Sequence, residues 1–171
     1  MNVARVTGML LACLLLITSC HAVSPAPSYN PLANMVAVPL TELPSRHHVL
    51  TVDINNVPGT FLLDTGANRS IVRESRLSRF HIERAESHGQ ARLINLREIE
   101  RGRAHDINSL SINNIPFPLG QILSANLDHL LDPIESVSAI TIDGVLGMDA
   151  LLSLGTLLDI RTVTLYIEPI D

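Results

Sequence analysis

A carboxylate placed on a tight turn between two apolar runs is the feature of this sequence best suited to chemistry. Asp64-Thr65-Gly66 follows the apolar residues 61–63 and precedes the apolar residues 71–72. An isolated carboxylate is costly in an apolar setting, but the hydroxyl of Thr65 and the backbone N–H of Gly66 could hold it in place without a cation. The same tripeptide also makes an ordinary turn. The apolar runs on both sides favour a carboxyl group that activates water.

A second motif follows about eighty residues downstream, where the chain reads Val145-Leu146-Gly147 and continues as Met148-Asp149-Ala150-Leu151. Taken in this order, Asp64-Thr65-Gly66-Ala67 and Val145-Leu146-Gly147 resemble the two motifs of the retropepsin-like aspartic proteases. The resemblance spans roughly residues 36–167. The residues after Gly147 are similar to the bacterial and cellular branch of that family, because the viral branch usually has Arg after the glycine.

The resemblance implies a fold and a mechanism. The fold would be mostly β, a small closed β-barrel-like acid protease domain with one or two short helices. The reaction would be hydrolysis of peptide bonds in a peptide or protein substrate by a dyad of Asp64 carboxylates, one from each subunit of a homodimer, since the chain has a single Asp-Thr-Gly turn. Two carboxyl groups about 3 Å apart share one proton. The ionised carboxylate would take a proton from water while the protonated carboxyl polarises the scissile carbonyl.

The residues around Asp64 have implied roles as well. Thr65 and Gly66 would keep the two carboxylates coplanar, and Val145, Leu146 and Gly147 would pack beside the catalytic turn. Ala67 stands where pepsin-like enzymes have Ser, which removes one hydrogen bond to the ionised carboxylate. We therefore expect a working range less acidic than that of pepsin, and an activity optimum as low as about pH 2–3 would contradict this expectation.

A flap is expected between about residues 87 and 103, although Gly89 and Gly102 are the only glycines there. We expect its tip at Gln90-Ala91-Arg92-Leu93-Ile94-Asn95. Nine of the twelve arginines lie between residues 69 and 103, interleaved with five Glu, and the net charge is −5. This mixture predicts a solvated face rather than a nucleic-acid groove, and an Arg-rich flap would bias the choice of substrate.

Other chemistries are excluded or disfavoured by what the sequence lacks. There is no Lys, which excludes Ser–Lys dyads, Schiff bases and a P-loop. No His-Glu-x-x-His motif or Cys pair suggests a zinc site, and no Gly-x-Ser-x-Gly elbow is present. We expect neither a metal nor another cofactor. Asp143 is interpreted as a turn residue and Asp149 as a helix N-cap, and neither is expected to be a second catalytic acid.

Residues 1–19 have the pattern of a bacterial lipoprotein signal peptide. Arg5 precedes an apolar run over residues 6–17 that is too short to span a bilayer. Ile17-Thr18-Ser19-Cys20 fits the lipobox pattern, which predicts lipidation of Cys20 and its exposure as the mature N-terminus. The alternative is an ordinary secretory signal with Cys20 incidental. Removal of the leader also removes Cys13, the one other cysteine.

The domain boundaries and location follow from this leader. We expect a lipid-anchored, Pro-rich tether over residues 20–36 and a protease domain over residues 37–171. The protein would be held at the membrane of a bacterial cell envelope and face the periplasm. If the source is Gram-negative, His21 in place of Asp favours the outer membrane.

The elements expected within the domain are mostly short strands. Strands are predicted over residues 37–40, 48–54, 60–63, 121–123, 156–159 and 163–167, and short helices over residues 73–80 and 149–154, the second ended by Gly155. Ile54-Asn55-Asn56-Val57-Pro58 is echoed by Ile112-Asn113-Asn114-Ile115-Pro116. The echo indicates either a duplicated β-unit or two similar hairpin turns.

Two functions other than proteolysis remain open from the sequence. The first is a non-catalytic, peptide-binding envelope lipoprotein that keeps the fold and the groove but not turnover. The second is an envelope scaffold without a groove function. The unusual flap is what keeps the binding function open.

Overall fold

The computed structural model describes residues 32–83, 90–94 and 99–169. The chain divides into two units, Met1–Asn30 and Pro31–Asp171, and the description concerns the second. The predicted leader, Cys20 and all but the end of the predicted tether lie outside the described residues, as does Asn95 of the expected flap tip.

The described chain is mostly β, as the sequence predicts, with three short helical segments. The strands are β1 (Val36–Pro39), β2 (Thr41–Glu42), β3 (His48–Ile54), β4 (Val57–Leu63), β5 (Ile71–Arg73), β6 (Gln90–Ile94), β7 (Ile99–Asp106), β8 (Leu110–Ile112), β9 (Ile115–Pro116), β10 (Gln121–Ala125), β11 (Gly144–Leu146), β12 (Leu157–Asp159) and β13 (Thr164–Ile167). The helical segments are the 3₁₀ helix η1 (Glu74–Phe80) and the α-helices α1 (Asp128–Ser138) and α2 (Met148–Ser153).

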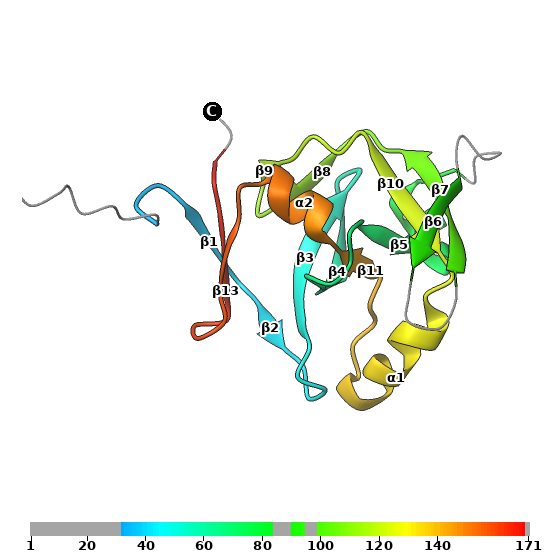
Figure 1. The fold of residues 1–171 in the computed structure, drawn as a ribbon, viewed down its shortest axis with the longest axis horizontal. Coiled ribbons are helices and arrows are strands. Elements are labelled where there is room, and N and C mark those ends of the chain that lie inside the picture. Colours follow the sequence, from blue (N-terminus) through cyan, green and yellow to red (C-terminus); the bar gives the residue numbers. More distant parts are fainter. Residues whose placement is uncertain (1–31, 84–89, 95–98, 170–171) are drawn as a thin grey trace, which may run out of the picture. The chain divides into compact units, whose positions relative to one another are not determined.

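Two sheets are formed by these strands (Figure 1). The larger has the order β6-β7-β10-β5-β11-β4-β3-β8-β9, with β2 paired to β3, and the smaller has the order β1-β13-β12. The pairs β10–β5 and β11–β4 are parallel. Among the described residues no pairing joins β6 to β9, so the larger sheet is open at both ends and closure into a barrel is not shown.

Both faces of the larger sheet are covered around β4 and β11. In β4 the neighbouring residues Phe61 and Leu62 belong to two different apolar clusters, because successive side chains of a strand point to opposite faces. In β11, Val145 and Leu146 divide between the same two clusters. Burial on both faces explains why these strands are uninterrupted apolar runs instead of alternating ones.

The echoed Asn-Asn segments are two hairpin turns of one type. Asn55 and Asn56 have φ of 51° and 63°, and Asn113 and Asn114 have φ of 50° and 63°. Two consecutive left-handed residues are the signature of the type I′ turn that joins antiparallel strands, and Asn tolerates this conformation. The turns join β3 to β4 and β8 to β9. Similar turns are therefore sufficient to explain the echo.

The C-terminal part of the domain agrees closely with the sequence prediction. Strands β12 and β13 pair antiparallel, with Leu157 opposite Tyr166 and Asp159 opposite Thr164. Helix α2 ends at Ser153, and Gly155 follows with φ of +53°, the left-handed conformation in which glycine is unstrained. The predicted helix over residues 73–80 is present as the 3₁₀ helix η1.

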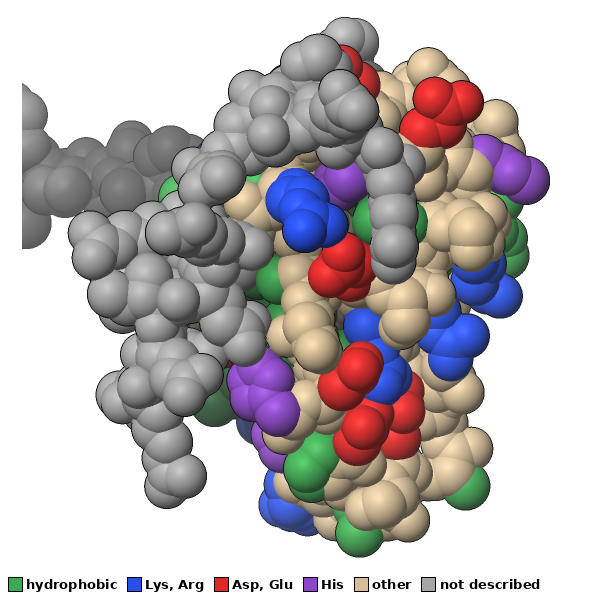
Figure 2. Space-filling model, turned by 90° about the vertical axis from the view of Figure 1, so that its right-hand side faces the viewer, with side chains coloured by type: hydrophobic (Ala, Val, Ile, Leu, Met, Phe, Trp, Pro, Cys, Tyr) green, Lys and Arg blue, Asp and Glu red, His purple; other side chains and the backbone are tan. Residues whose placement is uncertain are grey.

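Helix α1 was not predicted from the sequence. It packs Leu131 and Ile134 into the second apolar cluster. It also offers three carboxylates to the buried Arg73 of β5: Asp128 at 2.7 Å, Glu135 at 3.1 Å, and Asp132. Figure 2 shows acidic side chains gathered around basic ones on the side of the domain that carries α1.

The charge of Arg73 is stabilised by this arrangement. Burial by itself lowers the pKa of the guanidinium, but the hydrogen bonds that it donates to Asp128, Glu135 and Asp132 outweigh this effect and raise the pKa above its ordinary value. Glu135 also accepts a hydrogen bond from the backbone N–H of Ile142, which lies just before β11. Helix α1 is thereby tied to two neighbouring strands of the larger sheet.

No helix in the described ranges combines the length and the apolar character that a membrane crossing requires.

Candidate active site

The parallel pairing of β4 and β11 brings together the two motifs that the sequence singles out. Val145 lies opposite Leu62 and Leu146 opposite Leu63. The backbone N–H of Asp64 donates to the carbonyl of Leu146 at 3.0 Å. The last hydrogen bond between β4 and the end of β11 therefore fixes the backbone of Asp64. Asp64 therefore leaves the sheet where β11 ends.

The turn after β4 holds the carboxylate of Asp64 through the backbone. Its Oδ1 accepts a hydrogen bond from the N–H of Gly66 at 2.8 Å, and its carbonyl accepts one from the N–H of Ala67 at 3.2 Å. The carboxylate is partly exposed, and Thr65 and Gly66 are exposed. Among the described residues the hydroxyl of Thr65 makes no hydrogen bond to Asp64, and its role in a shared dyad stays a prediction.

Gly147 allows the loop after β11 to contact the backbone of the loop after β4. A Cβ atom built on Gly147 would lie 2.6 Å from both the carbonyl carbon and the oxygen of Arg69, and 2.8 Å from the carbonyl oxygen of Ala67. These are backbone atoms, so they could move only if the turn moved. The N–H of Met148 donates to the same Ala67 carbonyl at 2.8 Å. The residue after β11 must therefore lack a side chain.

Hydrogen bonds of Ser70 and Asp149 stabilise this contact. Oδ1 of Asp149 accepts hydrogen bonds from the N–H of Ser70 at 2.8 Å, the Oγ of Ser70 at 2.7 Å and the N–H of Ala150 at 2.8 Å. The Oγ of Ser70 in turn accepts from the N–H of Gly147 at 3.0 Å. The sequence did not indicate Ser70 as a site residue.

The N-cap prediction for Asp149 is wrong. Helix α2 begins at Met148, and its N-cap residue is Gly147, which makes no side-chain cap. Asp149 instead lies within the first turn and binds the residues that follow the Asp64 turn. A carboxylate in the first turn is favourable in any case, because it faces the positive end of the helix dipole.

Asp143 is buried and does not belong to a turn, which corrects the second assignment made from the sequence. Its Oδ2 accepts a hydrogen bond from the N–H of Thr60 at 2.9 Å, and its N–H donates to the Thr60 carbonyl at 2.8 Å. The Nε atoms of Arg76 and Arg79 lie 3.6 and 3.7 Å from its Oδ1. The role of Asp143 is to align the start of β11 with β4.

A β-hairpin stands where the flap is expected. Strands β6 and β7 pair antiparallel from Gln90 opposite Arg103 to Ile94 opposite Ile99. Gln90 to Ile94 therefore form a strand, and the prediction that they make the tip is wrong; the connection over residues 95–98 lies outside the described residues. The hairpin joins the larger sheet through β10, which pairs with β5 directly after the Asp64 turn.

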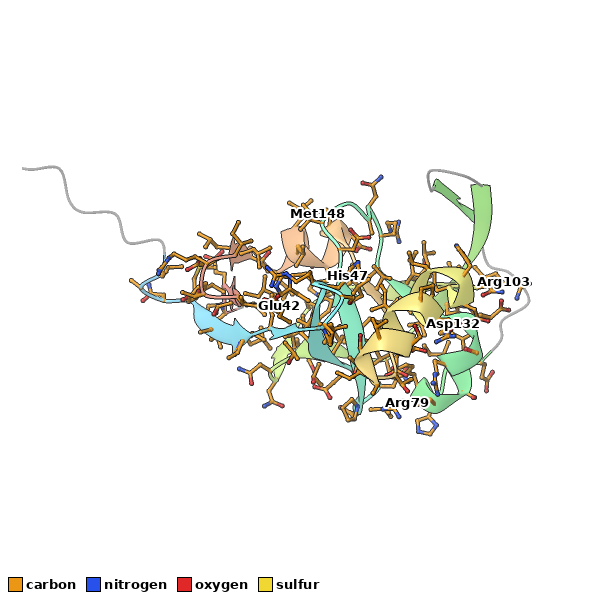
Figure 3. All side chains as sticks on the ribbon, turned by 90° about the horizontal axis from the view of Figure 1, so that it is seen from below. Glu42, His47, Arg79, Arg103, Asp132 and Met148 are labelled. Carbon is orange, nitrogen blue, oxygen red and sulfur yellow. The ribbon has the colours of Figure 1, made fainter. Side chains whose placement is uncertain are left out.

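The base of this hairpin is fixed by polar contacts. The ring of His105 is buried, with Nε2 2.7 Å from the Oγ of Ser124 and Nδ1 3.1 Å from the carbonyl of Glu83. Arg103 pairs with Glu74 of η1 at 2.7 Å and lies at the hairpin's base in Figure 3. The described residues contain no group of His, Cys, Asp and Glu that could hold a metal ion.

Known proteins resemble the chain in sequence and in fold. The family model described as aspartyl protease matches residues 50–150, which include both motifs. The structure of a retropepsin-like aspartic protease from Rickettsia conorii matches with a TM-score of 0.56 and 15% identity, over 79% of this chain and 90% of that one. The EIAV protease complexed with the inhibitor HBY-793 matches with a TM-score of 0.50 and 19% identity, over 70% of this chain and 99% of that one. No curated protein matches. At these identities the likeness establishes the fold.

Proposed function

This chain belongs to the aspartyl protease family, and from that premise we propose that it is an endopeptidase in which Asp64 activates water against a peptide bond. The observation that carries the proposal is the position of the Asp64 carboxylate. It leaves the sheet at the junction of β4 and β11, bound at one oxygen by the N–H of Gly66 and partly exposed. A fixed, accessible carboxylate is what general base catalysis on a bound water requires.

The second carboxylate is proposed to come from a second copy of the chain. The sequence contains one Asp-Thr-Gly turn, and a two-fold axis through that turn would place it against its own copy. The exposure of Thr65 and Gly66 supports this proposal, because it leaves the turn accessible. In the dyad, the ionised Asp64 takes a proton from water and the protonated Asp64 polarises the scissile carbonyl.

Cleavage of a mixed peptide library by the purified full chain tests this function. Turnover that depends on the purified protein supports the peptidase. Binding of peptides without any cleavage would support the non-catalytic peptide-binding function instead. If the chain neither binds nor cleaves peptides, the scaffold function is the one that remains. A pH profile of the same reaction tests the further expectation that the optimum lies well above that of pepsin.

We also propose that the chain is a lipoprotein of a bacterial envelope, held at the membrane through Cys20 and facing the periplasm. In this proposal the leader covers residues 1–19, the tether residues 20–36 and the domain residues 37–171. What supports the proposal is the apolar run that ends in Ile17-Thr18-Ser19-Cys20. In a Gram-negative cell, His21 favours the outer membrane.

Replacement of Cys20 by alanine is expected to abolish both acylation and membrane retention, because no other cysteine is left once the leader is removed. Metabolic labelling with a fatty acid, followed by membrane fractionation, measures both effects. Cys13→Ala is the matched control and should leave both unchanged, since Cys13 lies inside the leader. A Cys20→Ala protein that is still processed normally and still sediments with membranes would contradict the lipoprotein proposal.

A further inference from the structure

Arg69 follows the Asp64 turn, and its side chain has bonding capacity left over. Its backbone carbonyl lies at the contact with Gly147, so its Cα is fixed by the same packing that fixes the turn. Its side chain is 50% exposed, and its Nε donates to Oδ2 of Asp149 at 3.1 Å. Nη1 and Nη2 donate no hydrogen bond to the described residues.

Asp149 orients this arginine without neutralising its outer edge. The Oδ1 of Asp149 already accepts three hydrogen bonds, from Ser70 and Ala150, and only its Oδ2 meets Arg69. A guanidinium has five N–H donors in a planar fork, of which this contact uses one. The outer edge, formed by Nη1 and Nη2, has the geometry that binds a carboxylate with two parallel hydrogen bonds.

An arginine of this chain can hold more than one carboxylate, as Arg73 shows by pairing with Asp128, Asp132 and Glu135 together. Arg69 differs from Arg73 in being half exposed with a single partner. The half-exposed pair with Asp149 contributes little by itself, so it does not compete strongly with a second anion.

From these observations we infer that Arg69 binds a side-chain carboxylate of the substrate, so that the enzyme prefers peptides with Asp or Glu close to the scissile bond. This inference rests on the proposed peptidase function and names its substrate class. The two-fold axis proposed for the dyad adds a consequence: one Arg69 lies on each side of the scissile bond. Peptides with an acidic residue on both sides should then be preferred over peptides with one.

The test compares peptides that differ only by Glu or Gln at positions flanking the cleaved bond. The wild-type chain is expected to cleave the Glu peptide with a kcat/KM about fivefold higher than the Gln peptide, the upper end of what a partly exposed ion pair contributes. In Arg69→Gln this ratio should fall to about one, and Arg69→Lys should restore part of it because the charge is kept. Arg161 is an exposed arginine of the β12–β13 turn. The control variant Arg161→Gln makes the same change of charge and should leave the ratio and the activity unchanged.

Binding to the Asp64→Asn chain separates failure of this inference from failure of the peptidase function. Fluorescence anisotropy with the same two peptides gives a Kd ratio that requires no turnover, and tighter binding of the Glu peptide that is lost with Arg69→Gln supports Arg69. Equal binding and equal cleavage of the two peptides, or a preference that survives Arg69→Gln, would overturn the inference. Absence of cleavage with the binding preference intact would overturn the peptidase function alone.

Discussion

Asp64→Asn is expected to abolish peptide hydrolysis and leave the fold unchanged. The asparagine has the size of the aspartate, and its side-chain oxygen can still accept the hydrogen bond that Gly66 donates to Oδ1. It cannot ionise, so it cannot take a proton from water. General acid–base catalysis contributes up to about 10⁴-fold, and in the proposed dyad both copies lose the group at once. We expect a fall of at least about a thousandfold in kcat/KM.

Asp53→Asn is the matched control for this experiment. Asp53 lies on β3 opposite Pro58, near the turn that begins β4, whereas Asp64 follows the other end of that strand. The control should keep full activity. The thermal unfolding midpoint should be the same for the wild type and both variants, because neither position is buried. Substantial turnover by Asp64→Asn would show that another group activates the water.

Gly147→Ala is expected to damage both stability and activity. The added methyl group would lie 2.6 Å from the carbonyl carbon and oxygen of Arg69, and only a shift of the Asp64 turn could relieve that contact. Overfilling a packed site typically costs about 1–3 kcal/mol in the free energy of unfolding. A displacement of about 1 Å at a catalytic group costs on the order of a hundredfold in rate. Denaturant unfolding and peptide cleavage measure the two effects.

Gly120→Ala provides the control for this substitution. A Cβ atom on Gly120 meets nothing within 4 Å, so the same methyl group should change neither the unfolding free energy nor the activity beyond experimental error. If Gly147→Ala behaved like Gly120→Ala, the close backbone contact between the loops after β4 and β11 could not exist in solution.

The residues around Asp64 were predictable because their chemistry is local. Asp64 and Gly66 are two residues apart, and an apolar strand leads into them, so one short segment carries the signal. The Asn-Asn turns were visible for the same reason, since two consecutive left-handed residues select for Asn at both positions. The C-terminal hairpin also follows from nearby residues alone.

The features that the sequence did not reveal depend on partners far apart in the chain. Ser70 and Asp149 are separated by 79 positions, and neither residue type is unusual where it occurs. Asp143 precedes a glycine and so has the composition of a turn, but its partner Thr60 is 83 positions away. Local composition cannot distinguish a carboxylate that ends a strand from one that bridges two strands.

Helix α1 and the flap tip were missed for related reasons. The helix contains Pro133 and two aspartates, Asp128 and Asp132, which are residue types with poor helix propensity. Its stability comes from the packing of Leu131 and Ile134 in the core and from Arg73, and these partners lie far from the helix in the sequence. The flap tip was misplaced because the hairpin lacks a Gly cluster, so nothing in residues 90–94 distinguished a strand from a turn.

The claim that the site is shared between two copies of Asp64 is tested most directly by mixing the wild type with Asp64→Asn. Hydrolysis is measured at a fixed amount of wild-type chain while the inactive variant is added and subunits are allowed to exchange. A shared dyad predicts that a threefold excess of Asp64→Asn leaves roughly one quarter of the activity, since random pairing puts most wild-type chains into heterodimers with one ionisable carboxyl. Activity that stays strictly proportional to the wild-type chain, whatever the excess of variant, would contradict the account and place a complete site within one chain.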